Sequence, residues 1–164
     1  MSVALGILAS WVASALFIGA YYHHVPSPAG LPVFKSWAAS LAVPLLSLII
    51  GIGLAARHRF FDSRMDGSAP DKGDPLDIIL RYNQNTMEQL VIFAGAAALA
   101  LALMPETAAR LLPGMSLWFG VMRLAFYLGY KKSPTLRAFG FAGTFHPTLL
   151  LFFAALGSLI ASHG

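Results

Sequence analysis

The chain has 164 residues, of which 57% are hydrophobic and only 11% are charged, whereas a soluble domain carries about 25% charged residues. A soluble protein of this size could not bury so much apolar surface, so the composition predicts a chain that contacts lipid over much of its exterior. The net charge of +4 lies at the edges of the apolar segments and in two short loops, which favours membrane topology and an anionic ligand over nucleic-acid binding. Because the sequence contains no cysteine, thiol chemistry would have to come from a bound small molecule.

Five segments are long and apolar enough to cross the hydrocarbon core as helices, which takes about 20 residues. We expect the first to be retained rather than cleaved as a signal peptide, because it lacks a basic n-region and the first Lys or Arg is Lys35. We find no internal repeat and no second domain. The prediction is one all-α integral membrane domain over residues 1–164, with a four-helix transmembrane bundle over 37–162 and an extra N-terminal transmembrane helix. The five predicted spans cover residues 3–22, 37–56, 89–104, 111–130 and 139–162.

Basic residues mark one side of the predicted bundle. The loop after the second span and the start of the next helix carry five of them, and the loop between the fourth and fifth spans carries three. The other side has only Lys35 and Arg110. The positive-inside rule therefore places the basic loops and the N-terminus in the cytoplasm, with the inner membrane as the expected location in a bacterium. The eight basic residues are Arg57, Arg59, Arg64, Lys72, Arg81, Lys131, Lys132 and Arg137.

The segment 61–74 is polar and rich in glycine and proline, which predicts a mobile loop. The residues at its end are typical of the start of a helix. Asp74 can cap the N-terminus of that helix, Pro75 fits its first position, and Asp77 lies in its first turn, where a carboxylate suits the helix dipole.

The helix that follows carries a polar stripe made of Arg81, Gln84, Asn85 and Glu88. Their spacing puts all four on one side of a helix that runs from the membrane edge into the bilayer. Lipid cannot solvate a carboxylate at that depth, so Glu88 is expected to face protein or a water-filled cavity. The stripe fits either a binding site or an interhelical salt-bridge stripe that only holds the bundle together.

Arg123 interrupts the fourth span. It lies seven residues before Tyr130, and Glu88 lies seven residues after Arg81, so the two charges are expected at similar depth on antiparallel neighbours. An Arg123–Glu88 ion pair would neutralise both. We therefore favour a structural role for Arg123 over ligand contact.

The segment between the last two spans puts a cation in an unfavourable place. Ser133 and Pro134 resemble a cap and first helical position, so Arg137 falls in the first turn of the last helix, at the positive end of the dipole. A cation there is explained if an anion binds at this helix start. Lys131 and Lys132 are interpreted as topology anchors.

A set of polar and small residues follows one order and spacing through the last three helices: Arg81, Asn85, Glu88, Arg123, Gly129, Tyr130 and Arg137. This pattern resembles the MAPEG family (membrane-associated proteins in eicosanoid and glutathione metabolism), and is similar to its leukotriene C4 synthase and microsomal glutathione transferase members. The resemblance covers about residues 37–162.

The resemblance implies a homotrimer in the lipid bilayer with glutathione, a thiol co-substrate, bound between neighbouring subunits near the cytosolic side. Carried over to this chain, Arg81, Asn85 and Glu88 would hold the charged and amide groups of the tripeptide. Tyr130 would bind near the thiol or the peptide backbone. Arg137 would stabilise the thiolate, the form that acts as a nucleophile.

The implied activity is a glutathione S-transferase or glutathione-dependent peroxidase that acts on a hydrophobic small molecule dissolved in the membrane. The alternative is a non-catalytic relative that binds lipid-like ligands or partner proteins, although the presence of Glu88 and Arg137 favours an enzyme. Phe126 stands where the synthase-like pattern has a tyrosine, and the first helix has no counterpart in the four-helix core. Either Arg57 or Arg59 matches a further basic position, and another anionic thiol could replace glutathione.

The histidines and the paired glycines are not expected to form a further binding site. The histidines offer no set at matched depths for a haem or another metal, so we expect no metal and interpret them as edge or packing residues. The glycine pairs are expected to allow close helix packing. These residues are His23, His24, His58, His146, Gly51, Gly53, Gly140 and Gly143.

Overall fold

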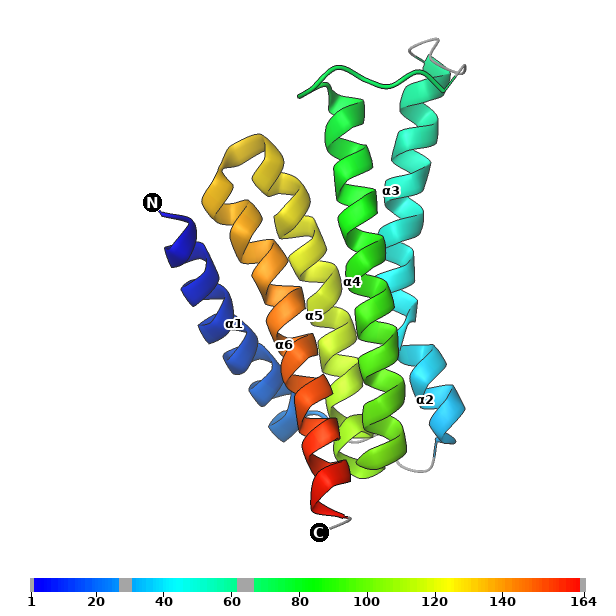
Figure 1. The fold of residues 1–164 in the computed structure, drawn as a ribbon, viewed down its shortest axis with the longest axis vertical. Coiled ribbons are helices and arrows are strands. Elements are labelled where there is room, and N and C mark those ends of the chain that lie inside the picture. Colours follow the sequence, from blue (N-terminus) through cyan, green and yellow to red (C-terminus); the bar gives the residue numbers. More distant parts are fainter. Residues whose placement is uncertain (1, 27–30, 62–66, 163–164) are drawn as a thin grey trace.

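The computed structural model describes residues 2–26, 31–61 and 67–162, and within them the ordered backbone is helical without any strand. The helices run alongside one another as a bundle, with α1 on one flank and α3 on the other (Figure 1). The helices are α1 (Val3–His24), α2 (Val33–Ser40), α3 (Ala42–Phe61), α4 (Pro75–Leu103), α5 (Pro105–Lys132) and α6 (Pro134–Ala161).

Within the described residues, five helical segments are long and apolar enough to cross a membrane, when α2 and α3 are taken together as 33–61. This confirms the predicted all-α fold with an additional N-terminal helix. The second segment is interrupted at Leu41. Pro44 explains the break, because proline lacks the N–H that would bond the Ser40 carbonyl and its ring collides with that carbonyl.

Both predicted helix starts are confirmed. Asp74 precedes α4, and its Oδ1 accepts a hydrogen bond from the Leu76 N–H at 2.8 Å. Ser133 precedes α6, and its Oγ accepts one from the Leu136 N–H at 3.2 Å. Because the polar approach to each span is part of the same helix, α4 and α6 begin well before the apolar spans predicted from residues 89 and 139.

The predicted loop at 61–74 is described only in part. Residues 62–66, with the basic Arg64, lie outside the described residues, and 67–73 are not helical. Gly73 has φ of +89°, a conformation that glycine adopts without strain.

The two ends of the bundle differ in charge. At one end α3 finishes, α4 starts and the α5–α6 turn lies, together with the start of α1 (Figure 1). We call this the basic end, because it carries most of the Lys and Arg residues, whereas Lys35 and Arg110 belong to the opposite end. The helices thus alternate in direction as predicted. The described basic residues of the basic end are Arg57, Arg59, Lys72, Arg81, Lys131, Lys132 and Arg137.

α5 lies at the centre of the bundle and contacts every other helix. Glycines let its neighbours approach closely. A Cβ on Gly140 would collide with the backbone of α5 at Phe126, and one on Gly51 would collide with the side chain of Asn83 on α4. The predicted packing role is therefore confirmed for these glycines and for Gly143, which lies against Met122. Gly53, in contrast, faces open space.

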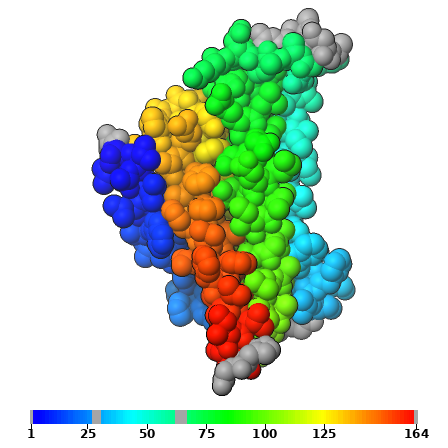
Figure 2. All heavy atoms as spheres, viewed as in Figure 1, coloured from blue at the N-terminus to red at the C-terminus, as the bar shows by residue number. Residues whose placement is uncertain are grey.

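α1 packs along α6 and against α5, and Figure 2 shows it as a separate ridge beside α6. Its buried residues are small and four apart, namely Gly6, Ser10 and Ser14, a spacing that lets helices approach closely in membranes. The Trp118 indole N–H of α5 donates a hydrogen bond to Ser14 Oγ at 2.9 Å. The rest of α1 is largely exposed, so this small-residue face is what attaches the helix.

We expect Gly6→Leu to weaken the attachment of α1, because a Cβ at Gly6 already meets the Thr135 carbonyl oxygen. Overpacking of this kind costs about 1–3 kcal/mol. Gly19→Leu is the matched control on the same helix, since nothing lies within 4 Å of a Cβ there. Thermal unfolding in detergent should show a lower melting temperature for Gly6→Leu alone, and equal values for both variants would contradict this packing.

Candidate functional site

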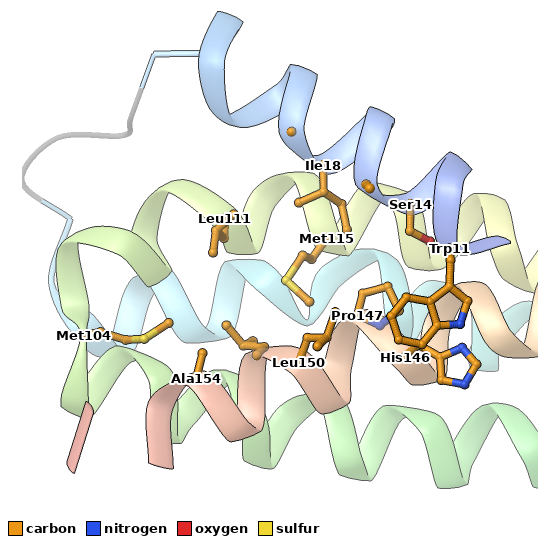
Figure 3. A pocket seen from close by; sticks show the side chains of 13 residues that line it. Trp11, Ser14, Ile18, Met104, Leu111, Met115, His146, Pro147, Leu150 and Ala154 are labelled. Carbon is orange, nitrogen blue, oxygen red and sulfur yellow. The ribbon is translucent and has the colours of Figure 1, made fainter. Parts of the chain in front are cut away.

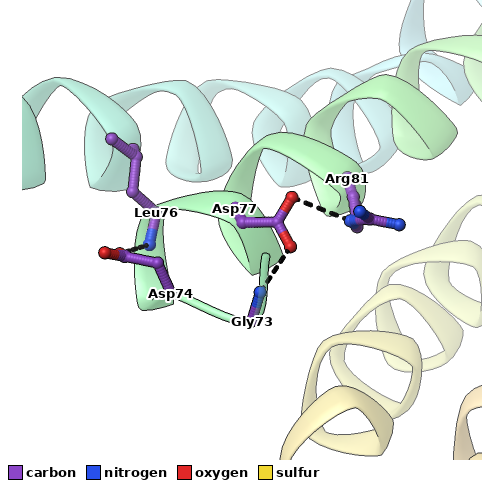
Figure 4. Close-up of polar contacts among 5 residues, drawn as sticks. All are labelled: Gly73, Asp74, Leu76, Asp77 and Arg81. Atoms are coloured by element: carbon purple, nitrogen blue, oxygen red, sulfur yellow. Dashed lines mark hydrogen bonds and ion pairs between the residues drawn. The ribbon is translucent and has the colours of Figure 1, made fainter. Parts of the chain in front are cut away.

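The start of α4 holds Arg81 in a fixed position (Figure 4). Asp77 Oδ1 accepts a hydrogen bond from Arg81 Nε at 2.9 Å, and Asp77 Oδ2 accepts one from the Gly73 N–H, also at 2.9 Å. The bond to Asp77 uses Nε, which leaves the two terminal nitrogens of the guanidinium for another acceptor. Because the Arg81 side chain is 52% exposed, this ion pair adds little stability. Its effect is to orient the guanidinium.

The polar stripe of α4 lines an open groove of about 570 Å³ between α3 and α4. The four residues of the predicted stripe therefore lie on one face of α4. Glu88 is exposed on this groove and accepts a hydrogen bond from Gln84 Nε2 at 2.9 Å. In the single chain Glu88 thus faces an open groove rather than the protein interior. The lining residues are Leu48 and Ile52 of α3 with Leu80, Arg81, Asn83, Gln84, Asn85, Met87 and Glu88 of α4.

Arg123 is fully buried at the centre of the bundle, at 0% exposure. Its guanidinium donates to Asn85 Oδ1 of α4 at 2.7 Å. It also donates to the Gly140 carbonyl at 2.9 Å and to Thr144 Oγ1 at 2.7 Å, both on α6. The charge is therefore solvated by neutral oxygens from two neighbouring helices, as buried charges require. Arg123 ties α4, α5 and α6 together, which supports its structural interpretation.

The predicted Arg123–Glu88 ion pair is wrong. Asn85, not Glu88, is the partner of Arg123 on α4, because Asn85 lies at the half-buried edge of the polar stripe whereas Glu88 lies on its exposed part. Arg123 instead fixes the amide of Asn85. Since Oδ1 accepts from the guanidinium, the amide nitrogen is left as the donor that Asn85 can offer to the groove.

Tyr130 and Arg137 meet at the basic end, where α5 turns into α6. The Arg137 guanidinium carbon lies 5.0 Å from the centre of the Tyr130 ring, within the range of a cation–π contact. Gly129 permits this turn, because a Cβ there would collide with the backbone of Arg137. Arg137 is exposed, and among the described residues it has no carboxylate partner. Within the described residues, the cation therefore stands in the first turn of α6 without a counter-ion.

A chain of contacts connects the two halves of the site. Arg123 lies 4.6 Å from the ring centre of Phe126, and Phe126 meets Tyr130 edge to face at 5.3 Å. Arg81 near the start of α4 and Tyr130 near the end of α5 both lie at the basic end. The structure therefore brings Arg81, Asn85, Tyr130 and Arg137 to one end of the bundle, with Glu88 further along the groove.

Phe126 is a packing residue. It is buried between Arg123 and Tyr130 and gives apolar support to both side chains. Sequence reasoning did not identify Thr144 and Gly140 as partners of Arg123. The spacing of Gly140 and Gly143 predicted only close helix packing, and nothing in the sequence marks Thr144 as a partner of a buried cation.

Arg57 lines a second cavity of about 270 Å³ at the end of α3. This cavity is shared with His58 and with Tyr127 of α5, and the Lys131 ammonium lies 5.0 Å from the Tyr127 ring centre. Of the two arginines that the sequence left as alternatives, Arg57 lines this cavity, which faces α5.

These features define a class: an integral membrane protein whose described residues form five long apolar helical segments, with polar and cationic side chains gathered at one end. The MAPEG family profile matches residues 36–157, which is most of the chain, and the protein belongs to the MAPEG family. No curated protein and no solved structure gives a significant match. The matched range leaves α1 outside it.

Proposed function

We propose that this protein is a glutathione S-transferase or glutathione-dependent peroxidase that acts on hydrophobic electrophiles dissolved in the membrane. Arg137 carries the proposal. It is an exposed cation in the first turn of a helix, in contact with Tyr130 and without a carboxylate partner in the described part of the chain. Both the helix start and the guanidinium favour an anion at this place, and both lower the pKa of a nearby thiol.

The side chains of the groove suit the other groups of the tripeptide. Glutathione carries two carboxylates, one ammonium group and two amides. Arg81 offers its terminal guanidinium nitrogens to a carboxylate, Glu88 offers a carboxylate to the ammonium group, and Asn85 offers an amide donor. This chain has no cysteine, so the thiol of the bound peptide would supply the nucleophile.

The proposed chemistry follows from a stabilised thiolate. For conjugation, the thiol loses its proton, the sulfur attacks an electrophilic carbon, and the new carbon–sulfur bond replaces the bond to the leaving group. For peroxidase activity, the thiolate sulfur attacks the terminal peroxide oxygen, the O–O bond breaks and the other oxygen takes up a proton and leaves as an alcohol. The sulfenic acid left on sulfur then reacts with a second glutathione thiol to give the disulfide and water. The apolar surroundings of the bundle would supply lipophilic substrates to either reaction.

We propose a homotrimer with the site facing the cytosol. The groove of α4 is open on one side, and Glu88 is exposed in a chain that belongs in lipid. A carboxylate at membrane depth needs cover from protein or water, which a neighbouring subunit would provide. Native mass spectrometry of the detergent complex should show three chains, and a stable monomer or dimer would contradict the composite site.

Glu88→Gln should weaken glutathione binding without loss of stability. The carboxylate is exposed and bonds only to Gln84 among the described residues, so unfolding should change by less than about 0.5 kcal/mol. Losing a charge-assisted hydrogen bond costs about 1.5–3 kcal/mol, or roughly tenfold or more in affinity. Glu106→Gln, an exposed carboxylate at the other end of the bundle, is the matched control. Equal affinity in both variants would remove Glu88 from the site.

The activity itself is tested by turnover of purified protein with glutathione. Conjugation of 1-chloro-2,4-dinitrobenzene reports a transferase, and reduction of cumene hydroperoxide reports a peroxidase. A non-catalytic, ligand-binding relative would show neither reaction although glutathione binds. Failure of both binding and turnover would overturn the proposed function.

A further inference from the structure

A pocket of about 320 Å³ lies between α1, α5 and α6, away from the groove of α4. Its volume falls at the lower end of the range for small-molecule sites, roughly 300–1,000 Å³. Figure 3 shows side chains from all three helices converging on it. The lining residues are Trp11, Ser14, Ala15, Ile18, Gly19, Met104, Leu111, Met115, His146, Pro147, Leu150, Leu151 and Ala154.

The pocket has a polar end and an apolar end. The Trp11 and His146 rings lie side by side, with centres 4.8 Å apart, and Ser14 is next to them (Figure 3). Towards Met104 and Leu111 the lining is aliphatic and thioether. Apart from the imidazole, no lining residue is ionisable. A matching ligand is therefore uncharged and mainly apolar, with a hydrogen-bonding group at one end.

The depth of the polar end decides which kind of molecule fits. His146 is near the middle of α6 (Pro134–Ala161), roughly 18 Å from its start and 22 Å from its end at about 1.5 Å per residue. Trp11 is likewise near the middle of α1 (Val3–His24). A bilayer phospholipid has only hydrocarbon at this depth, because its polar groups remain at the surface. The polar end thus suits a small molecule dissolved within the membrane.

We propose that α1, α5 and α6 form a binding site for a small, uncharged lipophile with one hydrogen-bonding oxygen, held by Trp11 and His146. This site is separate from the thiol site. Arg137 and Tyr130 are at the basic end, whereas the pocket runs from the middle of the helices towards Met104, at the opposite end. One of its three walls is α1, which the family match does not include. The added helix therefore creates a site that a four-helix core would lack.

The docking of α1 supports a formed pocket rather than a loose gap. Trp118 of α5 bonds Ser14 at 2.9 Å and stacks on Phe17 at 4.8 Å. At the other end, Arg110 donates to the Tyr22 carbonyl at 3.0 Å and lies 4.2 Å from the Tyr22 ring centre. Contacts on both sides of the pocket hold its α1 wall in place.

Photolabelling with benzophenone in lipid nanodiscs tests the site on the full chain. Benzophenone is uncharged, apolar and carries one carbonyl oxygen, and near-ultraviolet light makes that carbonyl insert into a neighbouring C–H bond to give a tertiary alcohol. Mass spectrometry should locate the label on Ile18, Met104 or Met115. Label confined to residues outside the pocket would overturn the proposal.

Two matched variants test occupancy. Gly19 lines the pocket and nothing lies within 4 Å of a Cβ there, so Gly19→Leu should fill the space without unfolding the chain. Gly157 on α6 is equally open but lies outside the pocket. Pocket labelling should fall about tenfold in Gly19→Leu, equivalent to roughly 1.4 kcal/mol, and stay unchanged in Gly157→Leu. Ala15→Leu, also in the lining, should reproduce the loss, and equal labelling in all three variants would contradict the site.

Competition tests the polar end. Diphenylmethanol and diphenylmethane share a shape, but only the first has an oxygen. In the wild type the alcohol should displace benzophenone more strongly than the hydrocarbon, and His146→Phe should abolish that preference. Equal competition in the wild type, or labelling that appears only after removal of phospholipid, would overturn the proposal in favour of an unspecific or lipid-filled space. None of these measurements depends on glutathione turnover.

Discussion

Arg137→Ala should lower glutathione conjugation by about 100-fold or more at neutral pH, the usual effect of removing a preorganised charge stabiliser. Loss of the guanidinium raises the pKa of the bound thiol, and each pKa unit corresponds to about 1.4 kcal/mol of thiolate stabilisation. Less thiolate is then present at neutral pH, so raising the pH should partly restore the rate. Thiolate absorbance in the ultraviolet, titrated at saturating glutathione, measures the pKa directly.

Two controls separate thiolate stabilisation from topology. Arg137→Lys keeps the charge but loses the planar set of donors, so it should retain part of the activity. Lys132→Ala removes an exposed cation beside the same turn and should leave both the pKa and the rate unchanged. The folding of Arg137→Ala should be nearly unaffected, since a cation in the first helical turn is unfavourable without an anion. A variant that titrates and turns over like the wild type would show that Arg137 is only an anchor.

Arg123→Met should destabilise the protein by about 2–5 kcal/mol, because a buried polar group left without its hydrogen-bond partner costs roughly 1–3 kcal/mol. Methionine fits the apolar surroundings of Phe119 and Phe126, so the lost stability would come mainly from polar groups left without a hydrogen-bond donor. The variant would remove the guanidinium donor from three acceptors, namely Asn85 Oδ1, the Gly140 carbonyl and Thr144 Oγ1. Thermal unfolding in detergent, followed by circular dichroism, measures the effect.

Arg123→Lys should be intermediate, because an ammonium group keeps the charge but cannot reach three acceptors on two helices in the same geometry. A second readout follows from Asn85. If Arg123 fixes the amide of Asn85, Arg123→Lys should also weaken glutathione binding in protein that is still folded. A stable Arg123→Met variant would contradict the account of this network.

The sequence predicted correctly those features that depend only on residues close together along the chain. The caps at Asp74 and Ser133 follow from side chains that bond the backbone two or three residues ahead. The stripe from Arg81 to Glu88 follows from helical periodicity alone. Hydropathy identified all five spans, although it missed the polar first turns that make α4 and α6 longer.

Features that depend on the rotation of one helix against another were not predictable. Depth along two antiparallel helices suggested Glu88 as the partner of Arg123, but depth does not fix which side of α4 faces α5. The side that does so presents Asn85. The other acceptors, Gly140 and Thr144, look in the sequence like ordinary packing residues. The pocket beside α1 could not be predicted from the sequence either, because it forms only when three helices pack together.

Calorimetric titration of glutathione into the detergent-purified protein, repeated in buffers of different ionisation enthalpy, tests the thiolate site most directly. We predict saturable binding with release of a proton, because the thiol would ionise beside Arg137. S-methylglutathione should bind without proton release, and Arg137→Ala should bind glutathione with little or none. Absence of saturable binding, or binding of glutathione to the wild type without proton release, would contradict the proposed site.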